Sequence, residues 1–162
     1  MRTIQEWHRS DAATEGYIVP PREGDRVPTK PNAQRKATTG NTAGVILVDE
    51  ALLLPGETIP PHRHTNLAEF FYVLEGDIVL RIGDRVTRAT AGTFAFSPIG
   101  NAHGFHNPGP EPARMLIGAL PPEPAERYFA AMARLPAEAD AAAWERVGRD
   151  HGVESVDPLP GG

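Results

Sequence analysis

The chain has 162 residues, of which 40% are hydrophobic and 23% are charged, a composition typical of one globular domain. It contains no cysteine, which excludes disulfide bonds and thiolate metal ligands, so any metal site has to use histidine and carboxylate. The formal net charge of −5 argues against a nucleic-acid partner, because phosphate binding depends on a basic surface.

Residues 1–44 are predicted to form an N-terminal arm, partly extended. Its Pro- and Gly-rich part carries five dispersed basic residues, Arg22, Arg26, Lys30, Arg35 and Lys36. We interpret this segment as a solvated arm, and the alternative is an arm that guides an anionic substrate to a binding site. The N-terminus lacks the apolar run of a signal peptide, and no later segment is long and uncharged enough to cross a membrane. The sequence therefore predicts a cytoplasmic protein with no membrane partner.

Residues 45–120 are predicted to form a β-barrel. Short apolar or alternating runs are separated by Gly, Pro, Asn and Asp, which is typical of consecutive strands. The runs cover residues 45–54, 69–74, 77–82, 85–91, 93–97, 103–107 and 113–120. The clearest tight hairpin lies at residues 82–86, where Gly-Asp joins two strand runs. Such short, regular strands favour a barrel over a βαβ arrangement.

The first histidine pair lies in the segment 56–69. On an extended strand, alternation points His62 and His64 to the same side. Glu69 opens the next strand and shares a face with Phe71 and Val73. A carboxylate on this apolar, inward face would be very costly without a partner, and a metal cation would remove that cost.

A third histidine follows in residues 92–107, a predicted strand, Pro/Gly turn and second strand. His103 shares a face with Phe105 and Asn107, whereas His106 points the other way and is left out of the site. The candidate ligands of one divalent metal ion are therefore His62, His64, Glu69 and His103.

Residues 121–162 are predicted to form a C-terminal helical extension. A helix over 124–135 places one stripe of side chains on a single face, namely Ala125, Tyr128, Phe129, Met132 and Leu135. A second helix over 140–150 carries Trp144 and Val147 on one side. We interpret both as packing surfaces that cover the barrel or a dimer partner. His8 and His151 are interpreted as ordinary polar residues.

The residues around the histidines resemble the two motifs of the cupin family. The first, Gly-x5-His-x-His-x4-Glu-x6-Gly, is matched at every defined position, by Gly56, His62, His64, Glu69 and Gly76. The second, Gly-x5-Pro-x-Gly-x2-His-x3-Asn, is matched by Gly92, Pro98, Gly100, His103 and Asn107. The resemblance implies an all-β fold, a double-stranded β-helix or jelly-roll barrel with the helices packed outside. Each motif occurs once, which implies a single barrel.

The strand at 69–76 and the C-terminal segment are similar to those of bacterial cupins of the quercetin 2,3-dioxygenase type. This similarity implies a metal-dependent dioxygenase that uses O2 and acts on a flavonol-like or polyketide-derived aromatic enol. It also implies that Glu69 both binds the metal and accepts the proton of a substrate hydroxyl. The ligand set suits Fe, Mn, Ni, Co, Cu or Zn, and the sequence does not choose among them.

An apolar lining around the ligands is expected to exclude water and to contact the substrate. The candidate lining residues are Phe71, Val73, Phe94, Phe96, Phe105 and Met115. All six are expected to face inward. The alternative role for at least half of them is ordinary barrel core.

Three hypotheses of function follow. The first is the dioxygenase, the second is a non-oxidative metal-dependent isomerase, cyclase or lyase, and the third is a barrel that binds a small ligand without catalysis. The N-terminal residues do not resemble a helix-turn-helix, which argues against a transcriptional sensor. A homodimer is expected, because small jelly rolls have exposed sheet edges and the N-terminal arm could pair with a neighbour.

Overall fold

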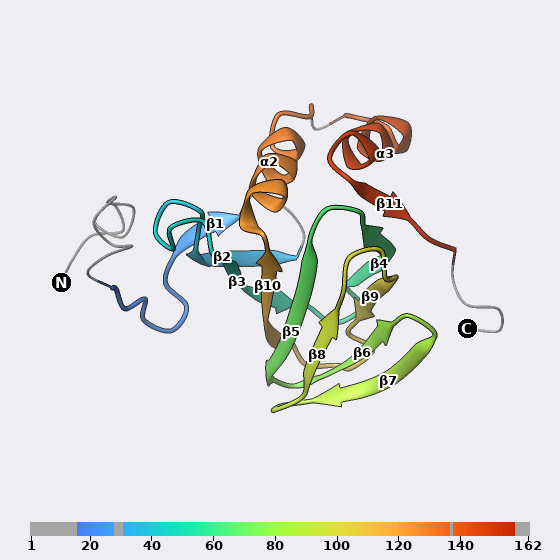
Figure 1. Ribbon diagram of the computed structural model, residues 1–162. Coiled ribbons are helices and arrows are strands. Elements are labelled where there is room, and N and C mark those ends of the chain that lie inside the picture. Colours follow the sequence, from blue (N-terminus) through green and yellow to red (C-terminus); the bar gives the residue numbers. More distant parts are fainter. Residues whose placement is uncertain (1–15, 28–30, 137, 158–162) are drawn as a thin grey trace.

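The alternating segments form two antiparallel β-sheets that face each other, with two helices beside one end (Figure 1). The computed structural model describes residues 16–27, 31–136 and 138–157. The first sheet has six strands in the order β1 (Asp25–Val27), β2 (Asn32–Ala37), β3 (Leu47–Leu53), β10 (Ala113–Leu120), β5 (Ala68–Glu75) and β8 (Phe94–Ser97). The second has five, in the order β11 (Val153–Ser155), β4 (Thr58–His64), β9 (His103–His106), β6 (Asp77–Ile82) and β7 (Arg85–Thr90).

This arrangement confirms the predicted all-β jelly roll. The two sheets bury one common apolar core between them, formed by Ala51, Leu53, Phe71, Val73, Ile78, Leu80, Phe105 and Met115 among others. The hairpin at 82–86 is also confirmed, because Ile82 pairs with Arg85 across the two-residue Gly83-Asp84 turn. Alternation along the strands therefore decides which side chains meet inside the barrel.

The N-terminal segment is more structured than the sequence suggests. Strands β1 and β2 extend the first sheet beside β3, and the Arg35 guanidinium forms an ion pair with Asp49 at 2.9 Å. Lys36 lies 2.8 Å from Glu50 in the same way. The interpretation as a solvated arm is therefore wrong for these two residues, because buried carboxylates on β3 compensate their charges. Residues 1–15, with His8, and Lys30 lie outside the described residues.

The helices begin close to where the sequence predicts them. Helix α2 (Pro122–Met132) starts with proline in its first turn, where the missing N–H costs nothing. Helix α3 (Ala141–Asp150) is capped by Asp140, whose carboxylate accepts a hydrogen bond from the Ala143 N–H at 2.8 Å. In the described part of the chain, neither helix has the length and apolarity needed to cross a membrane.

The helices are attached to the barrel by packing and by strand pairing. Ala125 of α2 packs in a small cluster with Leu47, Leu67 and Ala119, and Phe129 contacts both this cluster and the main core. After α3 the chain returns as β11 and pairs with β4, so that Val153 lies opposite His64. The extension therefore lies directly over the end of the barrel that carries the candidate ligands (Figure 1).

Replacing Gly104 with alanine is expected to destabilise the fold at the strand pair that carries three candidate ligands. A Cβ atom there would lie 2.9 Å from the Ile59 carbonyl oxygen and 3.1 Å from the Pro61 backbone, so β4 would have to move away from β9. Overpacking of this kind typically costs about 1–3 kcal/mol. Urea unfolding of the G104A variant measures the loss. The G40A variant is the control, since a Cβ there meets only the Thr38 hydroxyl at 3.8 Å, and equal stability of the two variants would contradict this account.

Candidate metal centre

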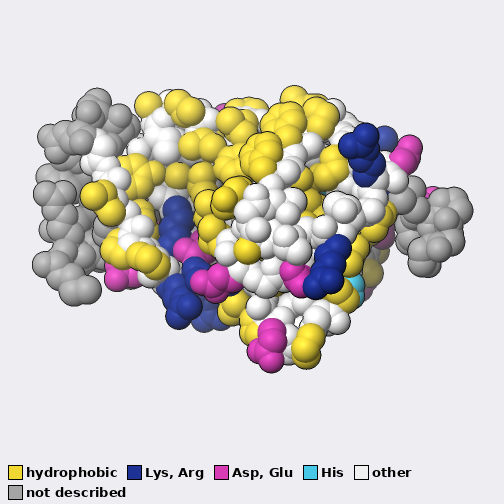
Figure 2. Space-filling model, turned by 90° about the horizontal axis from the view of Figure 1, so that it is seen from below, with side chains coloured by type: hydrophobic (Ala, Val, Ile, Leu, Met, Phe, Trp, Pro, Cys, Tyr) yellow, Lys and Arg dark blue, Asp and Glu magenta, His cyan; other side chains and the backbone are white. Residues whose placement is uncertain are grey.

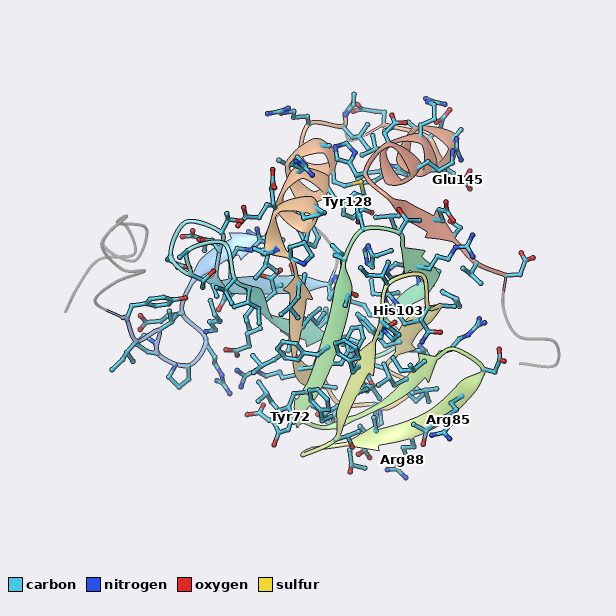
Figure 3. The ribbon with its side chains drawn as sticks, in the orientation of Figure 1. Tyr72, Arg85, Arg88, His103, Tyr128 and Glu145 are labelled. Atoms are coloured by element: carbon cyan, nitrogen blue, oxygen red, sulfur yellow. The ribbon has the colours of Figure 1, made fainter. Side chains whose placement is uncertain are left out.

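The four predicted ligands come together at one end of the barrel. His62 and His64 lie on β4, His103 lies on β9, and Glu69 reaches across from β5 in the opposite sheet. One ligand atom from each residue lies within 4.8 Å of the others. The cluster therefore joins the two sheets, and His103 is buried where they meet (Figure 3).

Strand pairing explains this convergence. His62 and His103 are direct cross-strand partners, and their ring centroids are 4.4 Å apart. The register between β4 and β9 is irregular between Ile59 and His62, where Pro60 and Pro61 lack the N–H groups that a regular ladder needs. His64, two residues beyond His62, faces the same side, with its ring 5.1 Å from that of His62.

A backbone carbonyl fixes the proton position of His62. Nδ1 of His62 lies 2.9 Å from the Pro60 carbonyl oxygen, and because a carbonyl oxygen only accepts hydrogen bonds, this nitrogen carries the proton. Nε2 of His62 is then left with a lone pair, the arrangement that second-sphere hydrogen bonds give to metal-binding histidines. Nδ1 of His103 has two neighbours, the Ser97 hydroxyl at 3.0 Å and the Asn101 carbonyl oxygen at 3.2 Å.

The electrostatics of the cluster fit a cation. Burial, with the neighbouring His103, lowers the pKa of His62 to about 4, so this ring is neutral at physiological pH. Burial raises the pKa of Glu69, but its contacts with His103 and His64 outweigh that effect and hold the pKa well below the usual range. The cluster therefore combines a partly buried carboxylate with a neutral imidazole donor, which are ligands for divalent transition metals.

Unpaired donor atoms are a second indication that the cluster fits a metal ion. Nε2 of His103 lies only 2.8 Å from a Glu69 carboxylate oxygen. This nitrogen and both ring nitrogens of His64 are buried without a hydrogen-bond partner in the described residues. Such atoms are costly to bury unpaired. A metal ion would satisfy them together, so the residues fit the predicted cofactor.

A cavity of about 710 Å³ lies beside the cluster and is lined by His62, His64 and Glu69. Its barrel wall consists mainly of apolar side chains, including Ile59, Leu67, Phe105 and Ile117. The opposite wall is formed by the C-terminal extension and includes Tyr128, Phe129, Met132, Trp144 and His151. The space is large enough for a molecule of drug size next to the candidate metal position.

The six predicted lining residues fall into three groups. Phe105 lines the cavity, whereas Phe71, Val73 and Met115 are fully buried in the barrel core. The inward orientation predicted for Phe94 and Phe96 is wrong, because these side chains are 62% and 49% exposed. Strand β8 pairs with β5 so that they lie opposite the outward-facing Tyr72 and Phe70, which places them on the outer surface.

The sequence interpretation missed the cavity wall formed by the extension. The helical stripe of Tyr128, Phe129 and Met132 was interpreted as packing, and these residues also line the cavity. His151, interpreted as an ordinary polar residue, lines it as well. The available signal was the tyrosine hydroxyl within an otherwise apolar stripe, since buried tyrosines usually need a hydrogen-bond partner. His106 lies outside the cluster, as predicted, with Nδ1 2.8 Å from the Thr58 hydroxyl.

The fold and the cluster define a small jelly-roll protein with a three-histidine, one-glutamate site in which His64 and His103 are buried. Comparison with known families agrees, because residues 50–118 match the Cupin domain family. The match comprises one copy of this domain and covers 69 of the 162 residues. The KdgF structure from Halomonas sp. superposes with a TM-score of 0.55 at 18% identity, covering 64% of this chain and 93% of that protein, which supports the fold alone.

Two curated relatives have a higher sequence identity to this chain than the KdgF structure has. The chain is 34% identical over 84 residues to the polyketide synthase CurC of Streptomyces cyaneus, which covers 52% of this chain and 53% of CurC. It therefore spans about half the length of that relative. It is 26% identical over 121 residues to the tetracenomycin polyketide synthase protein TcmJ of Streptomyces glaucescens, covering 75% of this chain and 69% of TcmJ.

Proposed function

We propose that this protein is a metal-dependent enzyme that acts with O2 on a polyketide-derived aromatic enol, as a dioxygenase. The observation that carries the proposal is the cluster of three histidines and Glu69 at the wall of a largely apolar cavity. The substrate class is supported by two relatives whose names place them in polyketide synthesis. A planar aromatic enol suits this cavity, since its rings contact apolar walls and its oxygen atoms meet the polar cluster.

In the proposed reaction, the residues of the chain have separate tasks. A redox-active divalent ion held by His62, His64, Glu69 and His103 would supply Lewis-acid and electron-transfer chemistry. Glu69 accepts the proton of the substrate hydroxyl at a carboxylate oxygen, which leaves the substrate as an enolate. Phe105 and Ile117 exclude water from the reacting face.

A non-oxidative reaction is the second candidate, in which the same site isomerises, cyclises or cleaves the substrate. Its specific support is the names of CurC and TcmJ, which refer to polyketide synthesis and to no oxygenation. The same proton transfer to Glu69 would begin this reaction, because an enolate is also the nucleophile of an intramolecular ring closure.

Oxygen consumption distinguishes the two candidates. The protein is reconstituted without oxygen with Fe(II), Mn(II), Ni(II), Co(II), Cu(II) or Zn(II), and each form is then mixed with a panel of aromatic enols in aerated buffer. Uptake of O2 in step with substrate loss is the expected result. Substrate loss without uptake would favour the non-oxidative reaction, and no substrate loss with any metal would contradict both.

We further propose that a second copy of this chain contacts the outer surface of β5 and β8. Phe94 and Phe96 are exposed there beside Phe70, on the edge strand of the first sheet. Figure 2 shows hydrophobic side chains gathered across this part of the molecule, and patches of this kind mark interfaces. The chain is expected to sediment as a dimer, and the double variant Phe94→Lys, Phe96→Lys as a monomer. Val45→Lys, at another exposed apolar residue, is the control, and a monomeric unaltered chain would contradict the proposal.

A further inference from the structure

Tyr128 carries a free hydroxyl group in the cavity. It lies on α2, above the end of the barrel that holds His103 (Figure 3), and its ring lines the cavity together with Glu69. Among the described residues, no group forms a hydrogen bond with the hydroxyl. Burial raises the pKa of Tyr128 and the Glu69 carboxylate raises it further, so the phenol keeps its proton and can donate it in a hydrogen bond.

His151 supplies the complementary group. Its Nδ1 lies 2.9 Å from the Val147 carbonyl oxygen and therefore carries the proton, which leaves Nε2 as a hydrogen-bond acceptor. The ring lines the cavity, and its centroid is 6.4 Å from that of Tyr128. The mechanism proposed above uses neither residue.

The backbone holds His151 in place relative to the metal cluster. The Asn66 side-chain amide donates a hydrogen bond to the His151 carbonyl oxygen at 2.9 Å, and the Thr65 N–H donates one to the Gly152 carbonyl oxygen at 2.8 Å. Gly152 has φ +80°, and a Cβ atom there would lie 2.5 Å from the Asn66 side chain, so only glycine fits this contact. The turn after α3 is thus tied to the loop that follows His64.

We infer that Tyr128 and His151 form a second polar recognition site in the cavity, a donor and an acceptor that bind the carbonyl and the hydroxyl group of a planar aromatic ligand. Phe129 and Trp144 of the same wall offer apolar contacts to the rings of such a ligand. The site lies on the extension, whereas the metal cluster lies on the barrel, so the ligand is held between the two. The choice of ligand class rests on the proposed function.

The test uses two probes that differ in the groups to be recognised. Quercetin carries a ring carbonyl and several hydroxyl groups, and flavone has the same ring system and carbonyl without any hydroxyl. Equilibrium binding of both probes is measured without oxygen by fluorescence titration, in the metal-loaded protein and in its variants. The metal content of every sample is measured in parallel, so that damage to the cluster is detected separately.

The Tyr128→Phe variant is expected to bind both probes about 3- to 10-fold more weakly, because the lost hydrogen bond serves the carbonyl that both share. The His151→Phe variant is expected to bind quercetin more weakly by a similar factor and flavone within about twofold of the unaltered protein. Tyr17→Phe is the matched control and should bind both probes normally, because the Tyr17 hydroxyl donates a hydrogen bond to the Asn41 side chain and the residue does not line the cavity.

Equal binding of both probes by the unaltered protein, Tyr128→Phe and His151→Phe would overturn the inference, as would failure of the unaltered protein to bind either probe. If His151 had only a structural role, the His151→Phe variant would bind both probes more weakly by the same factor. That result would also overturn the inference. These titrations need no turnover. Normal oxygen uptake with unchanged binding in the variants would contradict this inference and leave the proposed function standing. The predicted binding pattern without substrate loss would contradict the proposed function and leave this inference standing.

Discussion

Replacing His103 with alanine is expected to lower the affinity for a divalent metal by more than about 100-fold, because loss of a hydrogen bond to a ligating histidine alone typically costs 10- to 100-fold. His103 is fully buried, lies opposite His62 and contacts Glu69, so no other side chain can replace its donor atom. Equilibrium dialysis against Zn(II) gives the affinity, and circular dichroism confirms that the variant is folded.

The control for this variant lies on the same strand. His106 points away from the cluster and bonds to the Thr58 hydroxyl and the Glu57 carbonyl oxygen. The His106→Ala variant is expected to keep the metal affinity of the unaltered protein, since it removes an imidazole of β9 without touching the site. Equal affinities in the His103→Ala and His106→Ala variants would show that metal binds elsewhere.

Glu69→Gln is expected to separate metal binding from catalysis. The amide retains an oxygen atom that can bind a metal, but it has no negative charge and cannot accept the substrate proton. With metal supplied in excess, turnover is expected to fall by about 10²- to 10⁴-fold, the usual contribution of a general base. The measurement is the rate of substrate loss at saturating metal, with the bound metal determined in the same sample.

The matched control replaces another glutamate of β5. Glu75 is exposed at the far end of the strand and pairs with Arg114, so Glu75→Gln should retain full turnover. If Glu69→Gln held its metal and also turned over at the rate of the unaltered protein, Glu69 would act as a ligand alone, and the proton would have to leave by another route.

The cluster of candidate ligands could be predicted from the sequence because strand periodicity determines which way a side chain points. His62 and His64 are two residues apart, and Glu69 shares its face with Phe71, whose burial follows from the same alternation. Side chains two residues apart on a strand point to the same side wherever the strand lies in the fold. The fold adds the pairing of β4 with β9 and the packing of the two sheets, which brings Glu69 of β5 to the three histidines.

The cavity wall could not be predicted in the same way. A stripe such as Tyr128, Phe129 and Met132 shows that a helix has a buried face, but the docking of α2 on the barrel decides what that face meets. For Phe94 the error lay in the choice of face, because a four-residue strand such as β8 offers too few alternating positions to distinguish inside from outside.

Strands β1 and β2 could not be predicted from the sequence, and the reason is electrostatic. The segment Asn32–Ala37 is polar and charged, which is unusual for a strand that is paired on both sides. Arg35 is nevertheless accommodated there because Asp49 binds its guanidinium and the Phe129 ring lies 5.1 Å from it. Both partners are distant in sequence, and no local pattern reveals them.

The most direct test of the metal centre is the anomalous scattering of crystals of the Mn(II)- or Zn(II)-loaded protein, recorded at the absorption edge of the metal. One peak is expected within about 2.0–2.3 Å of Nε2 of His62, Nε2 of His103 and a Glu69 carboxylate oxygen, with His64 completing the set. A stoichiometric ion bound anywhere else, or a cluster that remains without a peak in protein shown to contain the metal, would contradict the account.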